Sequence, residues 1–128
     1  MSRKASVYAA AQNNAEWCHT FSRTHCTVGH FEKALWSSPV RTPPYYPDAV
    51  TLLPAATVEK VLSSIDTGEG CSVKDSLAHL DLGTAGFEPL FRAEWLAREP
   101  AVGPCHAPSG MVGRHHRRAA FRMGVGLG

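Results

Sequence analysis

Four cysteine and histidine side chains near the start of the chain are of the types that bind zinc. They are Cys18, His25, Cys26 and His30, with His19 beside the first. A tetrahedral zinc site takes four thiolate or imidazole ligands at about 2.0–2.3 Å. Seven residues separate the two cysteines, whereas the cysteine pair of common zinc fingers is only about two to four residues apart. The sequence therefore favours a buried cysteine with exposed loop histidines, and a zinc site is the alternative.

A second group of residues could contact phosphates. Residues 100–128 carry four arginines and no acid, a net charge of +4, whereas residues 1–99 have a net charge of −2. The arginines are Arg114, Arg117, Arg118 and Arg122. They could bind nucleic acid by charge alone, but only Phe121 supplies an aromatic ring among them. Because the rest of the chain is near neutral, the sequence favours a basic tail over a nucleic-acid site.

The stretch from Gly68 to Lys74 has some features of a phosphate loop or a reactive cysteine site. It lacks the Gly-Lys-Ser/Thr ending of a P-loop. No histidine and acid that could orient and activate Cys71 can be identified. A connection between a helix and a strand is therefore the favoured interpretation.

Two helices are predicted to support these residues. The first runs from Ser6 to about Phe21, and the second from Val58 to Ile65 with Thr57 as its N-cap. The residues expected on the buried face of the first helix are Val7, Ala10, Trp17 and Phe21. Those expected on the buried face of the second are Val58, Val61, Leu62 and Ile65. Trp36 and Trp95 are also predicted to be packed in or near the core.

Short apolar runs predict four strands, over residues 31–36, 48–53, 77–82 and 87–96. Prolines at 39, 43, 44 and 47 predict a loop between the first two, and the stretch 83–86 predicts a hairpin between the last two. Pro89 favours an edge position. Together these elements predict an α+β fold, an antiparallel sheet with helices packed on one face.

The predicted fold is incomplete and ends before the basic segment. Residues 1–98 form the α+β partial domain, and residues 99–128 show no hydrophobic periodicity, so we expect an unstructured, disordered basic tail. The unfinished sheet would leave an edge exposed, through which two copies of the chain could associate.

Composition limits the remaining possibilities. A chain of 128 residues with 44% hydrophobic and 19% charged residues is enough for one globular domain. No apolar stretch approaches the roughly 18 residues that span a bilayer, and the N-terminus does not resemble a signal peptide. We expect a cytoplasmic protein with no membrane partner and with its four cysteines reduced.

Several short sequence segments resemble the N-terminal portion of uncharacterised proteins of high-GC bacteria related to the GNAT N-acetyltransferases. They are Tyr46-Pro-Asp-Ala-Val-Thr-Leu, Ser72-Val-Lys-Asp-Ser, Leu80-Asp-Leu and Phe91-Arg-Ala-Glu-Trp. The resemblance covers residues 3–98. It implies relatives about twice as long as this chain, whose acetyl-CoA-binding half lies downstream.

The resemblance implies that this chain is catalytically silent. The family's pyrophosphate motif is Arg/Gln-x-x-Gly-x-Gly/Ala, and the only candidate, from Arg122 to Gly128, is one residue short before its first glycine and ends where the anion-binding helix would begin. We therefore expect no cofactor here. A frameshift or truncation after about residue 99 would explain the tail's composition, and a natural tail is the alternative. The other function left open is a small zinc- or nucleic-acid-binding protein.

Overall fold

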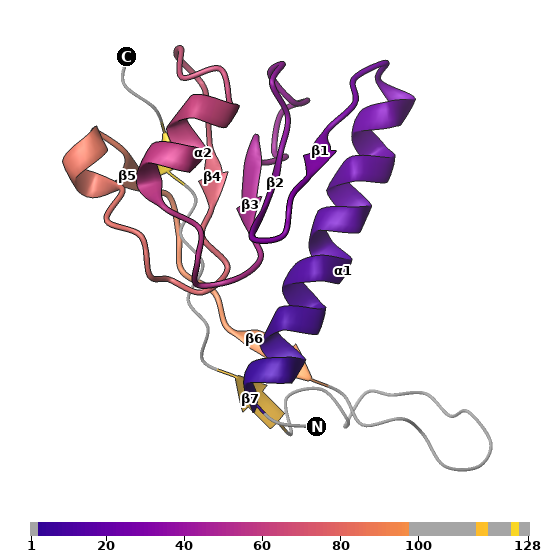
Figure 1. The fold of residues 1–128 in the computed structure, drawn as a ribbon, viewed down its shortest axis with the longest axis vertical. Coiled ribbons are helices and arrows are strands. Elements are labelled where there is room, and N and C mark those ends of the chain that lie inside the picture. The colour runs from indigo at the N-terminus through magenta and orange to yellow at the C-terminus, as the bar shows by residue number, and fades with distance from the viewer. Residues whose placement is uncertain (1–2, 98–114, 118–123, 126–128) are drawn as a thin grey trace.

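A four-stranded sheet lies between two helices, as the computed structural model shows (Figure 1). The structure describes residues 3–97, 115–117 and 124–125. The helices and the strands of the central sheet are α1 (Arg3–Thr24), β1 (His30–Phe31), β2 (Leu35–Ser37), β3 (Ala49–Thr51), α2 (Val58–Ser64) and β4 (Val73–Lys74). The remaining elements are the 3-10 turn η1 (Gly83–Ala85) and the strands β5 (Glu88–Pro89), β6 (Trp95–Ala97), β7 (His115–Arg117) and β8 (Gly124–Val125).

The sheet has the strand order β1-β2-β3-β4 and is mostly antiparallel. β1 pairs with β2 and β2 with β3 in antiparallel fashion, and Trp36 lies opposite Val50. β3 and β4 are parallel, with Val50 opposite Lys74. The parallel pair follows from the connection, because α2 carries the chain back across the sheet before β4 begins. The predicted α+β class is confirmed.

The two helices cover opposite faces of the sheet, which differs from the expected packing on one face. Leu35 and Ala49 belong to the cluster of buried residues that includes Val61 of α2. Their strand neighbours Trp36 and Val50 belong to the cluster that includes Ala11, Ala15 and Cys18 of α1. Successive residues of a strand point to opposite faces. Because both members of each pair are apolar, both faces of the sheet need a cover.

The buried side of α1 is a stripe of mostly small residues. Its members are Val7, Ala11, Ala15, Cys18 and Ser22, spaced at helical intervals. Trp17 was predicted to face the core, and that prediction is wrong, because its side chain is 60% exposed. Small side chains let the helix approach the sheet closely, and the space is filled from the sheet side by Trp36, which is fully buried as predicted.

The strand predicted over residues 77–82 does not form, because the chain turns after β4. Asp75 is fully buried, and its carboxylate accepts a hydrogen bond from the backbone N–H of Leu80 at 2.8 Å. Ala78 lies at φ 53°, a left-handed conformation that a strand cannot contain. Leu80 and Leu82 are buried, so the alternation in the sequence is real but belongs to a loop.

The predicted hairpin over residues 83–86 and the long strand after it are also replaced. η1 occupies the turn, and the residue that caps its end, Gly86, takes φ 92°. The segment 87–96 contains the short strand β5 and the start of β6. β5 pairs with β8, and β6 pairs with β7, both antiparallel. Pro89 therefore lies in a strand of two residues rather than inside a long one.

Two short pieces of the predicted tail are described, and both are strands. β7 and β8 belong to the segment 99–128, and the rest of that segment lies outside the described residues. None of the helices that the structure describes is long and apolar enough to cross a membrane.

Candidate binding cleft

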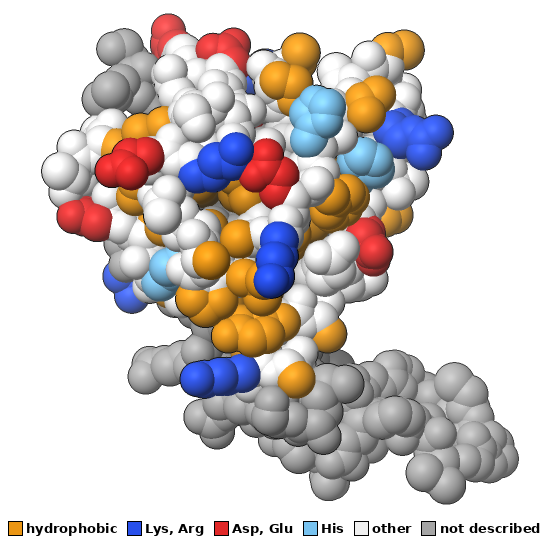
Figure 2. Space-filling view, in the orientation of Figure 1, with side chains coloured by type: hydrophobic (Ala, Val, Ile, Leu, Met, Phe, Trp, Pro, Cys, Tyr) orange, Lys and Arg blue, Asp and Glu red, His pale blue; other side chains and the backbone are white. Residues whose placement is uncertain are grey.

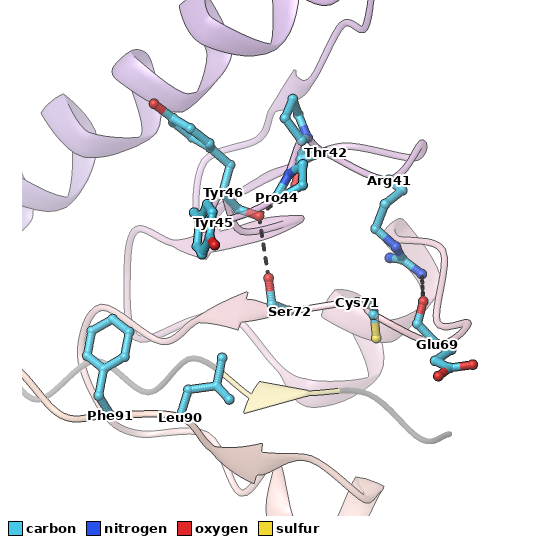
Figure 3. A pocket seen from close by; sticks show the side chains of 12 residues that line it. Arg41, Thr42, Pro44, Tyr45, Tyr46, Glu69, Cys71, Ser72, Leu90 and Phe91 are labelled. Atoms are coloured by element: carbon cyan, nitrogen blue, oxygen red, sulfur yellow. Dashed lines mark hydrogen bonds between the residues drawn. The ribbon is translucent and has the colours of Figure 1, made fainter.

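A cleft of about 740 Å³ opens between three segments that are distant in the sequence. They are the loop 41–46 between β2 and β3, the turn 69–72 before β4, and residues 90–91 after β5 (Figure 3). The lining residues are Arg41, Thr42, Pro43, Pro44, Tyr45, Tyr46, Glu69, Gly70, Cys71, Ser72, Leu90 and Phe91. We call this site the aromatic cleft.

Asp48 holds the first two walls of the aromatic cleft together. Its carboxylate is 1% exposed and accepts hydrogen bonds from the N–H of Thr42 at 2.8 Å and the N–H of Ser72 at 3.1 Å. The hydroxyl of Thr42 also donates to it, at 3.1 Å. A buried carboxylate is stable only when its oxygens are paired and hydrogen-bonded. One buried charge therefore fixes the loop 41–46 against the turn 69–72.

Arg41 completes this arrangement from the other side. One guanidinium nitrogen donates to Asp48 Oδ2 at 2.8 Å and to the carbonyl of Asp66 at 2.9 Å. The other donates to the carbonyls of Gly68 and Glu69 at 3.0 and 2.9 Å. The fork of donors on an arginine suits such multiple contacts. Arg41 is thus engaged in holding the turn, and its charge is balanced by Asp48.

The loop 41–46 presents Tyr45 in a strained conformation. The N–H of Tyr46 donates to the carbonyl of Pro43 at 3.1 Å, closing a tight turn with Pro44 in its second position and Tyr45, at φ 74°, in its third. A type II turn requires a positive φ there and normally uses glycine. A tyrosine in this position costs about 1–2 kcal/mol. The side chain of Tyr45 is nevertheless 98% exposed, so packing does not explain it.

Replacing Tyr45 by glycine should therefore stabilise the protein. We expect the free energy of unfolding to rise by about 0.5–1 kcal/mol, because glycine removes the left-handed strain at the cost of a more flexible unfolded chain. Chemical denaturation measures the change. Tyr45→Ala keeps a Cβ and is the matched control, with no gain expected. Destabilisation by Tyr45→Gly would show that the tyrosine side chain supports the fold.

The far wall of the aromatic cleft is apolar and exposed. Leu90 and Phe91 are each about half exposed, and in Figure 3 the side chain of Tyr45 points towards them across the opening. Tyr46 instead turns its ring to α1, where it stacks on Phe21 with centroids 3.9 Å apart and planes 8° apart. Exposed apolar side chains gathered around one opening indicate an interaction surface.

Cys71 lies at the base of the aromatic cleft as an unreactive thiol. It is 1% exposed, and burial raises the pKa of its thiol, while the nearby Arg41 acts in the opposite direction. A protonated thiol is a poor nucleophile. The prediction that residues 68–74 connect a helix to a strand is consistent with this placement between α2 and β4.

The described cysteines should differ sharply in their reactivity. Cys26 is exposed, whereas Cys18 and Cys71 are buried, and burial raises the pKa of Cys18 to about 11. Near pH 8, in a Cys105→Ser background, we expect a thiol reagent to label Cys26 rapidly and the other two only after denaturation. Peptide mass spectrometry reads the sites. Equal labelling of Cys18 or Cys71 in the folded protein would contradict their burial.

The residues of the predicted zinc site are not assembled as a metal site. Cys18 faces the sheet, and His25, Cys26 and His30 are exposed around the end of α1 and in β1. In the part of the chain that the structure describes, no three potential metal ligands come together. His19 instead packs on Phe31, and its Nδ1 accepts a hydrogen bond at 3.1 Å from the indole N–H of Trp36.

The predicted phosphate contacts fall mostly outside the described residues. Arg114, Arg118 and Arg122 are not described, and of Arg117 only the backbone is described, in β7. On the face shown in Figure 2, acidic and basic side chains of the described residues are interspersed rather than gathered by sign. Nucleic-acid binding by the arginines stays a prediction.

No family model, curated protein or solved structure matches this chain. The resemblance to GNAT-like proteins therefore stays a prediction.

Proposed function

We propose that this chain is a catalytically silent binding module that holds an extended polypeptide segment in the aromatic cleft. The observation that carries the proposal is Tyr45, a fully exposed aromatic side chain held at φ 74° over the opening. Backbone strain without a packing benefit tends to occur at functional sites. Together with Leu90 and Phe91, which are each about half exposed, Tyr45 offers apolar contact area at the opening of the cleft.

The chemistry of the lining favours binding over catalysis. General acid–base or nucleophilic catalysis needs a nucleophile and a base within hydrogen-bond reach of one another. Cys71 is a buried thiol with a raised pKa, and the described residues that line the cleft include no histidine, lysine or aspartate. The cation that does line it, Arg41, is committed to Asp48 and to three backbone carbonyls.

The same lining favours a polypeptide over a small polar molecule. Small-molecule sites direct a few well-placed polar groups at the ligand. Here the hydroxyl of Thr42 donates to Tyr46 O at 2.7 Å, and that carbonyl also lies 3.5 Å from the hydroxyl of Ser72. The hydroxyls of Thr42 and Ser72 are thus used within the protein. Exposed aromatic, proline and leucine side chains remain, which is how grooves for extended proline-containing segments are built.

The GNAT-like resemblance is compatible with this proposal. The short segments that carry the resemblance contain residues that build the fold. Asp48 ties the two cleft walls together. The hydroxyl of Thr51 accepts a hydrogen bond from the N–H of Ser76 at 2.7 Å and donates one to Asp75 at 3.3 Å. Sequence segments of this kind specify a scaffold rather than a catalytic centre. We propose that the chain is the N-terminal module of a cytoplasmic GNAT-like protein and does not bind acetyl-CoA itself.

Calorimetric titration with a proline decapeptide tests the binding proposal. We expect saturable binding by the wild-type chain and its loss in Phe91→Ala. Trp17→Ala, which removes an equally exposed aromatic ring from α1, should bind as the wild type does. Equal weakening by both variants, or no binding by the wild-type chain, would overturn the proposal.

Titration with acetyl-CoA separately tests the proposal that this chain is catalytically silent and does not bind the cofactor. We expect no measurable binding, because a pyrophosphate requires several backbone N–H groups converging at a preformed loop and helix start. No helix that the structure describes starts among the described residues that line the aromatic cleft. A dissociation constant in the micromolar range would show that this chain carries a cofactor site of its own.

A further inference from the structure

We infer that the aromatic cleft selects cationic segments, with an arginine or lysine of the bound polypeptide next to Glu69. The inference rests on the proposed binding function and adds the charge of the partner. Both ends of the cleft contribute to this selectivity. Tyr45 and Phe91 lie at an aromatic end, and Glu69 lies at an acidic end (Figure 3).

Arg41 is the only cation among the described lining residues, and its charge is compensated within the protein. Arg41 Nη1 is 2.8 Å from Asp48 Oδ2, and the side chain of Asp48 is 1% exposed. The four hydrogen bonds of the guanidinium to Asp48 and to the carbonyls of residues 66, 68 and 69 use its donors inside the protein. Its positive charge is therefore compensated by a buried neighbour, and an approaching ligand meets the remaining charges.

Those remaining charges are negative. Glu69 lines the cleft and is exposed. Its backbone carbonyl, rather than its carboxylate, accepts the hydrogen bond from Arg41. In Figure 3 its carboxylate extends beyond the turn, away from that contact. Asp66 lies close by, with its carboxylate 55% exposed and 3.9 Å from Arg41 Nη2. Once Asp48 is counted against Arg41, two exposed carboxylates therefore remain at or near this end of the cleft, that of the lining residue Glu69 and that of Asp66.

The two ends together define the partner's chemistry. Tyr45, Leu90 and Phe91 accept proline or aliphatic residues by apolar contact. The acidic end favours a positively charged residue in the same extended segment. Because the carboxylates of Glu69 and Asp66 are exposed, the gain in binding free energy is modest and falls with salt. Complementary charge of this kind contributes mainly to specificity.

Three peptides distinguish the charge preference from the binding function itself. Each has the same proline-leucine core and ends in alanine, arginine or glutamate, and each is titrated against the full chain. We expect the arginine peptide to bind several-fold more tightly than the alanine peptide, and the glutamate peptide to bind most weakly. The advantage of arginine should shrink at high salt and in Glu69→Gln. Glu16→Gln, which removes an exposed carboxylate from α1, should leave it unchanged.

The outcomes separate the two proposals. Equal binding of the alanine and arginine peptides would overturn the charge preference and leave the binding function standing. If the arginine peptide still bound more tightly than the alanine peptide in Glu69→Gln, the charge preference would likewise be overturned and the binding function would stand. Absence of binding by all three peptides would overturn the binding function and the charge preference together.

Discussion

Replacing Asp48 by alanine should lower the free energy of unfolding by about 3–5 kcal/mol, as expected when one partner of a buried charge pair is removed. The carboxylate is 1% exposed and is the acceptor for Arg41, for Thr42 and for the N–H of Ser72. Without it, the nearest carboxylate of the described residues to the partly buried Arg41 guanidinium is that of Asp66, which is 3.9 Å away and 55% exposed. Two backbone donors also lose their acceptor. Urea or guanidinium denaturation measures the loss.

Asp48→Asn separates the charge from the hydrogen bonds. Asparagine keeps one acceptor oxygen for the N–H and hydroxyl of Thr42, so we expect a smaller loss than with alanine. A loss below about 1 kcal/mol for Asp48→Ala, typical of a surface ion pair, would contradict the role we give this residue in fixing the cleft walls.

Replacing Trp36 by alanine should cost about 3–5 kcal/mol, the usual range for truncating a fully buried aromatic residue. Trp36 is 0% exposed and fills the space between β2 and α1. Its packing is close, because a Cβ added at Gly29 would come within 2.5 Å of its ring atoms. The variant also removes the donor for His19. Thermal or chemical unfolding measures the effect.

Trp17→Ala is the matched control for Trp36→Ala. The side chain of Trp17 is 60% exposed, so its removal should change stability by no more than about 0.5 kcal/mol. If Trp17→Ala destabilised the protein as much as Trp36→Ala, the assignment of the buried face of α1 would be incorrect.

Elements with a complete local pattern were predictable from the sequence. α2 forms where Val58, Val61, Leu62 and Ile65 repeat at helical spacing, and its N-cap Thr57 accepts a hydrogen bond from the N–H of Lys60 as predicted. β3 forms within the short apolar run before Pro54. In both cases the preference of the segment and the needs of the core agree.

The face of α1 was not predictable from its large residues. Aromatic side chains indicated one side, but the helix packs through alanines and Cys18, because the bulk is supplied by Trp36 from the sheet. The strand prediction for residues 77–82 was wrong for a different reason. The alternation of this segment is that of a strand, but the buried Asp75 draws the chain into a turn through its bond to the N–H of Leu80.

The aromatic cleft was missed because its three walls, residues 41–46, 69–72 and 90–91, are distant from one another in the sequence. The four prolines predicted the loop 39–47, and that loop is present. The sequence carries one usable signal, a Pro-Pro-Tyr-Tyr turn followed by an aspartate that ends up buried. The contacts of Asp48 with Ser72 are long-range, and no local pattern predicts which donors a buried carboxylate will find.

The most direct test of the cleft as a binding site is an NMR titration of the isotope-labelled chain with the arginine-bearing proline-leucine peptide. Binding in the aromatic cleft predicts amide shift changes at residues 41–42, 45–46, 69–72 and 90–91, with the exposed face of α1 around Trp17 unaffected. Shift changes confined to α1 or to β1, or none at saturating peptide, would contradict the assignment of the cleft.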